Sequence, residues 1–81
     1  MSGNSPITPQ DAFGQALRGL RLGAGLSQEQ LGLESGVQRN FISLIETVQN
    51  QPSISTIFKL AAALDVKPFH LMVATEKLLH K

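Results

Sequence analysis

The chain has 81 residues, the length of one small domain. Apolar residues make up 42% of it and charged residues 16%, a balance that supports a folded core and excludes a disordered tail protein. It has no cysteine, which excludes disulfides, thiolate metal sites and a cysteine nucleophile, and its net charge of +1 confines any nucleic-acid contact to a local patch.

Membrane and catalytic roles find no support in the sequence. No apolar run approaches the ~18–20 residues of a membrane helix, and no signal segment opens the chain, so we expect a cytoplasmic protein that does not contact membranes. We expect no enzyme activity at this length, and neither a cofactor nor a small-molecule ligand. We expect no metal site, because the two histidines, His70 and His80, lie ten residues apart at the end of the chain.

The first helix has clear start and stop signals. Residues 1–8 are small and polar and predict a flexible arm. Thr8 can cap a helix that begins at Pro9, with Asp11 completing a capping box, and Ala24-Gly25 stops it. Its apolar stripe consists of Phe13, Leu17 and Leu20. Three glycines weaken this helix: Gly14, Gly19 and Gly23.

Two short helices follow, joined by a tight turn. Ser27 starts a second capping box, and the helix after it runs through about Ser35. Gly36 permits a turn at positive φ, and a third helix runs from about Arg39 to Thr47. The residues expected to point inward are Leu31, Ile42 and Ile45.

The remaining chain predicts two more helices. Ser53 caps the fourth, and Pro68 opens a last helix that reaches about Leu79. The periodic apolar positions of the fourth are Ile54, Ile57, Leu60, Ala61 and Leu64. Since no segment has the period of a strand, we predict an all-α protein: a compact five-helix bundle over residues 9–81, with the last helix serving dimerisation.

The second and third helices have helix-turn-helix geometry. Opposite Ile42 and Ile45, the third helix presents one continuous stripe: Arg39, Asn40, Ser43, Leu44 and Thr47. Arginine can pair with guanine and asparagine with adenine in the major groove of DNA. Periodicity alone equally allows a solvated helix face.

Three stretches of sequence carry a family pattern: FGQALRGLRLGAGLSQEQLGLESGV, NFISLIE and PSISTIFKLAAALDVKP. Through them residues 13–73 resemble the Cro/repressor (XRE-type) helix-turn-helix family. The resemblance implies a lambda-repressor-like DNA-binding domain whose default partner is double-stranded DNA. It says nothing about the target sequence.

The resemblance also implies residue roles. Ser27 caps the second helix and turns its free N–H groups toward a phosphate, and Gln28 contacts a phosphate and braces the third helix. Arg21 and Glu46 match a structural pair that ties the third helix to the first. The positions that reach base edges are Gln38, Arg39, Asn40, Ser43 and Leu44, with Thr47 at the end of the same stripe. For Leu44, contact with a thymine methyl group and half-buried packing both stay open.

The chain departs from the family after the third helix and at two other positions. Where many members have glycine and basic residues, this chain has Val48, Gln49 and Asn50. Phe41 replaces a frequent tyrosine, and Gly32 replaces a common alanine at a close helix contact, a change we expect to be harmless for packing. Fewer cations predict a shallower salt dependence of DNA binding.

The last helix has two apolar stripes, one more than the core requires. Its first stripe consists of Phe69, Met72, Val73, Glu76 and Leu79, and its second of Leu71, Thr75 and Leu78. An unpartnered apolar stripe is typical of an interface, so we predict a twofold homodimer with Phe69, Met72, Val73 and Leu79 in the interface. The sequence leaves open which face is used, and a loosely ordered terminal helix is the alternative.

Together these features predict a sequence-specific transcriptional regulator, a repressor or autoregulator, that binds an operator as a homodimer. The alternative is a protein-interaction module that keeps the fold without binding specific DNA, which the near-neutral charge favours. The sequence does not distinguish a phage repressor from a restriction–modification controller or an antitoxin.

Overall fold

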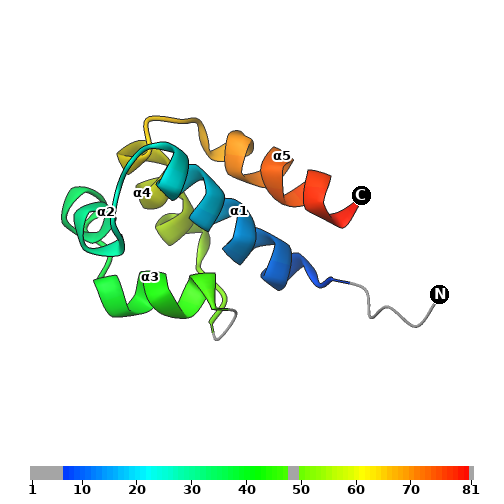
Figure 1. The fold of residues 1–81 in the computed structure, drawn as a ribbon, viewed down its shortest axis with the longest axis horizontal. Coiled ribbons are helices and arrows are strands. Elements are labelled where there is room, and N and C mark those ends of the chain that lie inside the picture. Colours follow the sequence, from blue (N-terminus) through cyan, green and yellow to red (C-terminus); the bar gives the residue numbers. More distant parts are fainter. Residues whose placement is uncertain (1–6, 48–49, 81) are drawn as a thin grey trace.

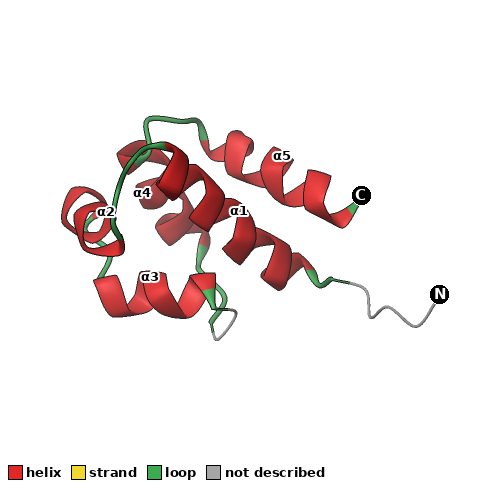
Figure 2. Ribbon diagram, viewed as in Figure 1, coloured by secondary structure: helices red, strands yellow, loops and turns green. Residues whose placement is uncertain are grey.

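The computed structural model describes residues 7–47 and 50–80. Within these ranges the chain forms five helices and no strand (Figures 1 and 2). They are α1 (Pro9–Gly23), α2 (Gln28–Ser35), α3 (Arg39–Glu46), α4 (Ile54–Ala63) and α5 (Pro68–Leu79). The predicted all-α class and helix order are confirmed. Residues 1–6 of the predicted arm, Val48 and Gln49 lie outside the described residues.

Both predicted capping boxes are present. The Thr8 hydroxyl accepts a hydrogen bond from the Asp11 N–H at 3.0 Å, and the Asp11 carboxylate accepts one from the Thr8 N–H at 3.4 Å. Ser27 and Gln30 exchange the same two bonds at 3.0 and 2.8 Å. These contacts satisfy N–H groups that have no partner within the first turn of a helix, and they fix where α1 and α2 begin.

Helix ends are defined by three different residues. Gly36 ends α2 at φ 79°, the left-handed conformation expected for it. Asp65 follows α4 at φ 58°, and the Val66 N–H bonds to the Ala61 carbonyl at 3.0 Å in a Schellman motif. α3 ends one residue earlier than predicted, because Thr47 leaves helical geometry and caps it.

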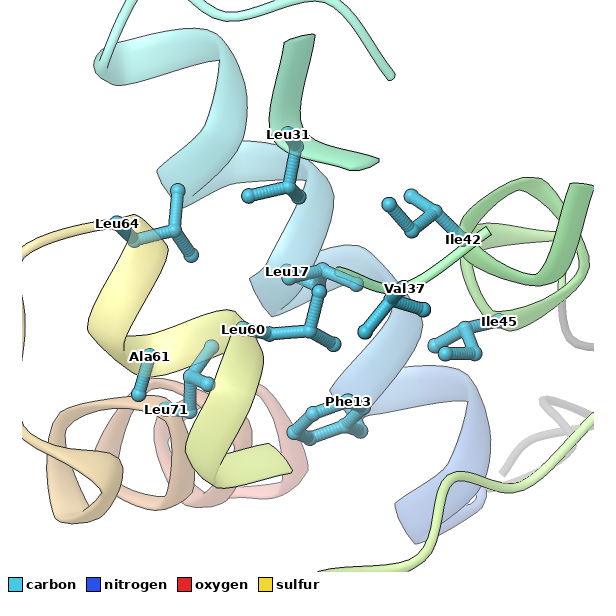
Figure 3. Close-up of a cluster of buried hydrophobic side chains, with 10 residues drawn as sticks. All are labelled: Phe13, Leu17, Leu31, Val37, Ile42, Ile45, Leu60, Ala61, Leu64 and Leu71. Atoms are coloured by element: carbon cyan, nitrogen blue, oxygen red, sulfur yellow. The ribbon is translucent and has the colours of Figure 1, made fainter. Parts of the chain in front are cut away.

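The core lies where the five helices meet, and its side chains are almost entirely aliphatic (Figure 3). Its fully buried large side chains are Leu17, Leu31, Ile42, Ile45, Leu60 and Leu71. The prediction that Leu31, Ile42 and Ile45 point inward is therefore confirmed. Of the periodic apolar positions of the fourth helix, Leu60 is buried, whereas Ile54 is 73% exposed because it begins α4 at the edge of the bundle.

The arrangement leaves α3 at one edge of the molecule. α5 runs beside α1 in the opposite direction, and α1 separates α5 from α3 (Figure 1). α3 packs against α1 and α2. Its outer face is therefore free of other helices, which is the placement that a helix needs in order to enter a groove of DNA.

Candidate nucleic-acid interface

The exposed stripe of α3 is assembled as the sequence predicts. Ile42 and Ile45 are buried and fix the inner face, with at most 1% of either residue exposed. Opposite them lie the side chains expected to read bases: Gln38, Arg39, Asn40, Leu44 and Thr47 are exposed, and Ser43 is half-buried. The structure thus collects the predicted contact residues on one face.

Three side chains of this stripe, Gln38, Thr47 and Leu44, offer different groups for contact with a ligand. Gln38 is the N-cap residue of α3 but makes no side-chain capping bond, so its amide is available to a ligand. The Thr47 hydroxyl donates to the Ser43 carbonyl at 2.8 Å, which commits its hydrogen and leaves it an acceptor only. Leu44 is 38% exposed and can offer an apolar contact.

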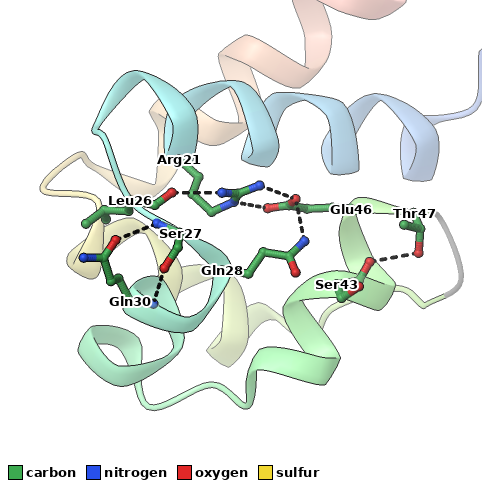
Figure 4. Close-up of polar contacts among 8 residues, drawn as sticks. All are labelled: Arg21, Leu26, Ser27, Gln28, Gln30, Ser43, Glu46 and Thr47. Carbon is green, nitrogen blue, oxygen red and sulfur yellow. Dashed lines mark hydrogen bonds and ion pairs between the residues drawn. The ribbon is translucent and has the colours of Figure 1, made fainter.

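A buried ion pair connects α3 to α1, as expected for Arg21 and Glu46 (Figure 4). The Arg21 Nε and Nη2 atoms donate to the two carboxylate oxygens of Glu46 at 2.7 and 2.9 Å. The Arg21 Nη1 atom donates to the Leu26 carbonyl at 2.9 Å. The side chains of the pair are only 8% and 2% exposed, and the hydrogen bond to Glu46 raises the pKa of Arg21. Arg21 is therefore a structural cation, held away from solvent.

Gln28 joins this pair and makes it a three-residue cluster. Its Nε2 atom donates to the Glu46 Oε1 atom at 3.1 Å (Figure 4). Because a carboxylate only accepts hydrogen bonds, this contact turns the amide nitrogen toward Glu46. The first residue of α2 thus contacts the last residue of α3, 18 positions along the chain. The motif resemblance implied that Gln28 braces α3 but did not indicate Glu46 as its partner.

A second exposed surface, which is apolar, includes side chains of α5 and α4. Leu71 and Thr75 are buried, so the stripe containing Phe69, Met72 and Val73 faces outward. Leu79, the fourth predicted interface residue, is half-buried. Sequence reasoning missed two further exposed side chains on α4, Ile54 and Phe58, because apolar spacing does not reveal which side of a helix the bundle covers.

No helix in ranges 7–47 and 50–80 combines the length and apolar character needed to cross a bilayer. Nor do three or more histidine, aspartate or glutamate side chains of these ranges gather where they could hold a metal ion.

Comparison with known proteins agrees with this geometry. The family model "Helix-turn-helix" matches residues 17–71. HTH-type transcriptional regulator y4dJ of Sinorhizobium fredii is 33% identical over 72% of this chain and 75% of its own length. Control protein C.BamHI of Bacillus amyloliquefaciens is 39% identical over 74% of this chain and 75% of its own.

A solved structure extends the similarity to three dimensions. The restriction-modification controller protein C.AhdI from Aeromonas hydrophila has a TM-score of 0.75 and 45% identity, over 76% of this chain and 94% of its own. The chain belongs to the helix-turn-helix family of transcriptional regulators. The resemblance read from its motifs is thereby confirmed.

Proposed function

We propose that this regulator binds an operator in double-stranded DNA as a homodimer, with α3 in the major groove, and represses transcription or regulates its own gene. The observation that carries the proposal is the outward stripe of α3, in which Arg39 and Asn40 are exposed above a fully buried inner face. Bidentate contacts from Arg to guanine and from Asn to adenine supply the sequence reading. The role is regulatory rather than enzymatic, and we place it in the cytoplasm with the DNA.

The helix before the stripe supports this role. Ser27 caps α2, whose N-terminal end carries a partial positive charge that favours a phosphate. Gln28 stands at the same end with its amide nitrogen held by Glu46. One of the two amide hydrogens remains for a phosphate oxygen. These contacts would set the position of the protein on the duplex without reading its sequence.

The dimer part of the proposal rests on an exposed apolar surface that spans α4 and α5. We call Ile54, Phe58, Phe69, Met72 and Val73 the apolar patch; each is at least 40% exposed. One member of the patch, Met72, lines a shallow hollow of about 190 Å³ together with Ile57 of α4, residues of α1, and Gln51 and Pro52. Since large contiguous apolar surfaces are uncommon on monomers, a second copy related by a twofold axis is the occupant we propose. Such a dimer offers two α3 helices to two half-sites about one DNA turn, roughly 34 Å, apart.

The similarity to C.BamHI and C.AhdI favours one of the three settings that the sequence left open. We place this chain with restriction–modification controllers rather than with phage repressors or antitoxins. We also propose that residues 1–8 form an arm and that residues 9–81 form the helix-turn-helix domain.

The DNA-reading part is tested by titrating the protein against the duplex upstream of its own gene and a scrambled duplex, at two salt concentrations. We expect tighter binding to the upstream duplex that persists at the higher salt. The double variant Arg39→Ala, Asn40→Ala should lose the preference while keeping helicity and molar mass. Lys59→Ala, which removes an exposed cation of α4, is the matched control and should bind as the parent does. Equal, salt-sensitive binding of the parent to both duplexes would refute specific reading and favour the interaction module.

The dimer is tested separately by light scattering. Phe69→Lys places a charge in the apolar patch and should reduce the molar mass to that of one chain at tens of micromolar. Leu33→Lys, on α2, alters a side chain that is 80% exposed but lies outside the patch, and should leave the mass unchanged. A parent protein that is monomeric at this concentration would exclude the dimer.

A further inference from the structure

Leu44 is the one apolar member of the exposed stripe of α3, and its surroundings bear on the two roles that the sequence left open for it. It is 38% exposed, whereas Ile45, its neighbour on the same helix, is 1% exposed. The core cluster and the partly buried apolar side chains packed against it include Phe41, Ile42 and Ile45 of α3, but not Leu44. These contacts support the outward role of Leu44 over packing.

The polar neighbours of Leu44 offer little to a base edge at this end of α3. On one face of a helix, a residue lies next to those four positions before and three positions after it, here Asn40 and Thr47. The Thr47 hydroxyl donates to the Ser43 carbonyl at 2.8 Å and to the Leu44 carbonyl at 3.4 Å. The two side chains that are exposed among residues 43–47, Leu44 and Thr47, thus present an apolar group and an acceptor, but no hydrogen-bond donor.

The length of α3 brings Leu44 to the bases together with Asn40. α3 has 8 residues and is therefore about 12 Å long, which is about the width of the major groove. Leu44 follows Asn40 by four residues, about 6 Å along the helix axis. A helix of this length that enters the groove as proposed keeps both of its turns there, so Leu44 faces base edges.

The major groove has one apolar group on its base edges, the methyl group on C5 of thymine. The nitrogen and oxygen atoms of these edges donate or accept hydrogen bonds, and a leucine placed against them removes water without replacing its hydrogen bonds. A methyl group loses no hydrogen bond on such a contact. 5-Methylcytosine carries its methyl group on the same ring carbon and presents it at the same place in the groove.

We propose that Leu44 is a specificity-determining residue, which selects a pyrimidine with a C5 methyl group, thymine or 5-methylcytosine, at one position of each half-site. The inference rests on the proposed function and deepens it, because it names the chemical group that the second turn of α3 reads. In this scheme Arg39 and Asn40 read hydrogen-bonding groups, and Leu44 reads a methyl group beside them.

The first arm of the experiment changes only the DNA. Each thymine of the duplex upstream of the protein's own gene is replaced in turn by deoxyuridine, which pairs with adenine in the same way and lacks only the methyl group. We expect one thymine in each half-site to respond. Losing the burial of one methyl group should lower the affinity about 4-fold at one half-site and about 16-fold when both half-sites are changed.

The second arm changes the protein. Leu44→Ala should bind the thymine and uracil duplexes equally at the responsive position. Leu22→Ala makes the same chemical change at a leucine of α1 that is 54% exposed, and should keep the parental difference. Helicity and thermal unfolding are measured for both variants.

The third arm separates the two sources of the methyl group. At the responsive position, the thymine–adenine pair is replaced by cytosine–guanine, with and without a methyl group on C5 of the cytosine. The parent should bind the methylated duplex about 4-fold more tightly, and Leu44→Ala should bind both duplexes equally.

A parent that prefers the upstream duplex but responds to no thymine replacement overturns the inference and leaves the proposed function intact. So does a Leu44→Ala variant with the parental loss, since another residue would then contact the methyl group. Equal binding of the cytosine and 5-methylcytosine duplexes by the parent would overturn the methylcytosine part and restrict the contact to thymine. A parent without preference for the upstream duplex overturns the proposed function, and this inference with it.

Discussion

Replacing Glu46 by alanine removes the carboxylate that joins α1, α2 and α3. Arg21 would keep only the Leu26 carbonyl as a partner, and Gln28 would lose its bond to α3. Truncating one partner of a buried ion pair typically costs about 3–5 kcal/mol, because the remaining charge is left buried and uncompensated. A domain of 81 residues has a total stability of about 4–12 kcal/mol. We therefore expect Glu46→Ala to lose a large share of the free energy of unfolding.

The assay is urea unfolding followed by circular dichroism, at one fixed protein concentration because the proposed dimer would make stability depend on concentration. Arg21→Met should cost a similar amount, since it leaves the Glu46 carboxylate with the Gln28 amide alone. The double variant Arg21→Met, Glu46→Leu leaves no buried charge and should be more stable than either single variant. Gln28→Ala, which removes one hydrogen bond, should cost about 1 kcal/mol.

The pH dependence of this pair has a definite sign. The hydrogen bond to Glu46 raises the pKa of Arg21 above its unfolded value. The stability it adds is complete below the unfolded-state pKa and is lost only as the pH rises through the higher, folded-state pKa. Arg21 therefore contributes equally at pH 6 and pH 9.

Single variants that each lose less than about 1 kcal/mol, or a double variant that loses the sum of both, would refute this account of the pair.

Two further predictions concern helix ends. Asp65→Gly should raise the free energy of unfolding by about 0.5–1 kcal/mol, because it relieves the positive φ and removes a negative charge from the C-terminal end of α4. Asp65→Ala removes the same charge but keeps a side chain at positive φ, so it should raise the free energy of unfolding by less. Equal gains for the two variants in urea unfolding would show that backbone strain plays no part. Ser27→Ala should lower stability by about 1 kcal/mol through loss of the bond from the Gln30 N–H, and an unchanged thermal midpoint would argue against the cap.

The parts of the fold that local chemistry determines could be predicted from the sequence. The Thr8 and Ser27 capping boxes, and the turn at Gly36, each follow from residues within a few positions of one another. The buried face of α3 follows from the spacing of Ile42 and Ile45. These features locate the exposed stripe of α3, so the residues of that stripe could be predicted from the sequence.

The parts that depend on packing between distant segments could not be predicted. Gly14 meets Ile45 across 31 positions, and nothing near Gly14 distinguishes it from Gly19, which has free space. The exposure of Phe58 depends on where α5 lies beside α4. Asp65 adopts the left-handed conformation, with φ 58°, that usually ends a helix at a glycine. Because the residue here is an aspartate, the sequence did not indicate how α4 ends.

The stripe of α3 that we propose reads the operator carries little charge. Arg39 is the one cation among the stripe residues, and the eight residues before Pro9 contain no lysine or arginine. In the proposed dimer the two Arg39 side chains displace about two condensed counterions when they enter the groove, so the slope of log affinity against log salt should be about −2. Titrations at four or more salt concentrations measure it, and a slope steeper than about −5 would show that phosphate contacts outside the stripe dominate. With so little of the binding supplied by charge, the proposed contacts of Arg39 and Asn40 with bases would have to supply most of the operator affinity.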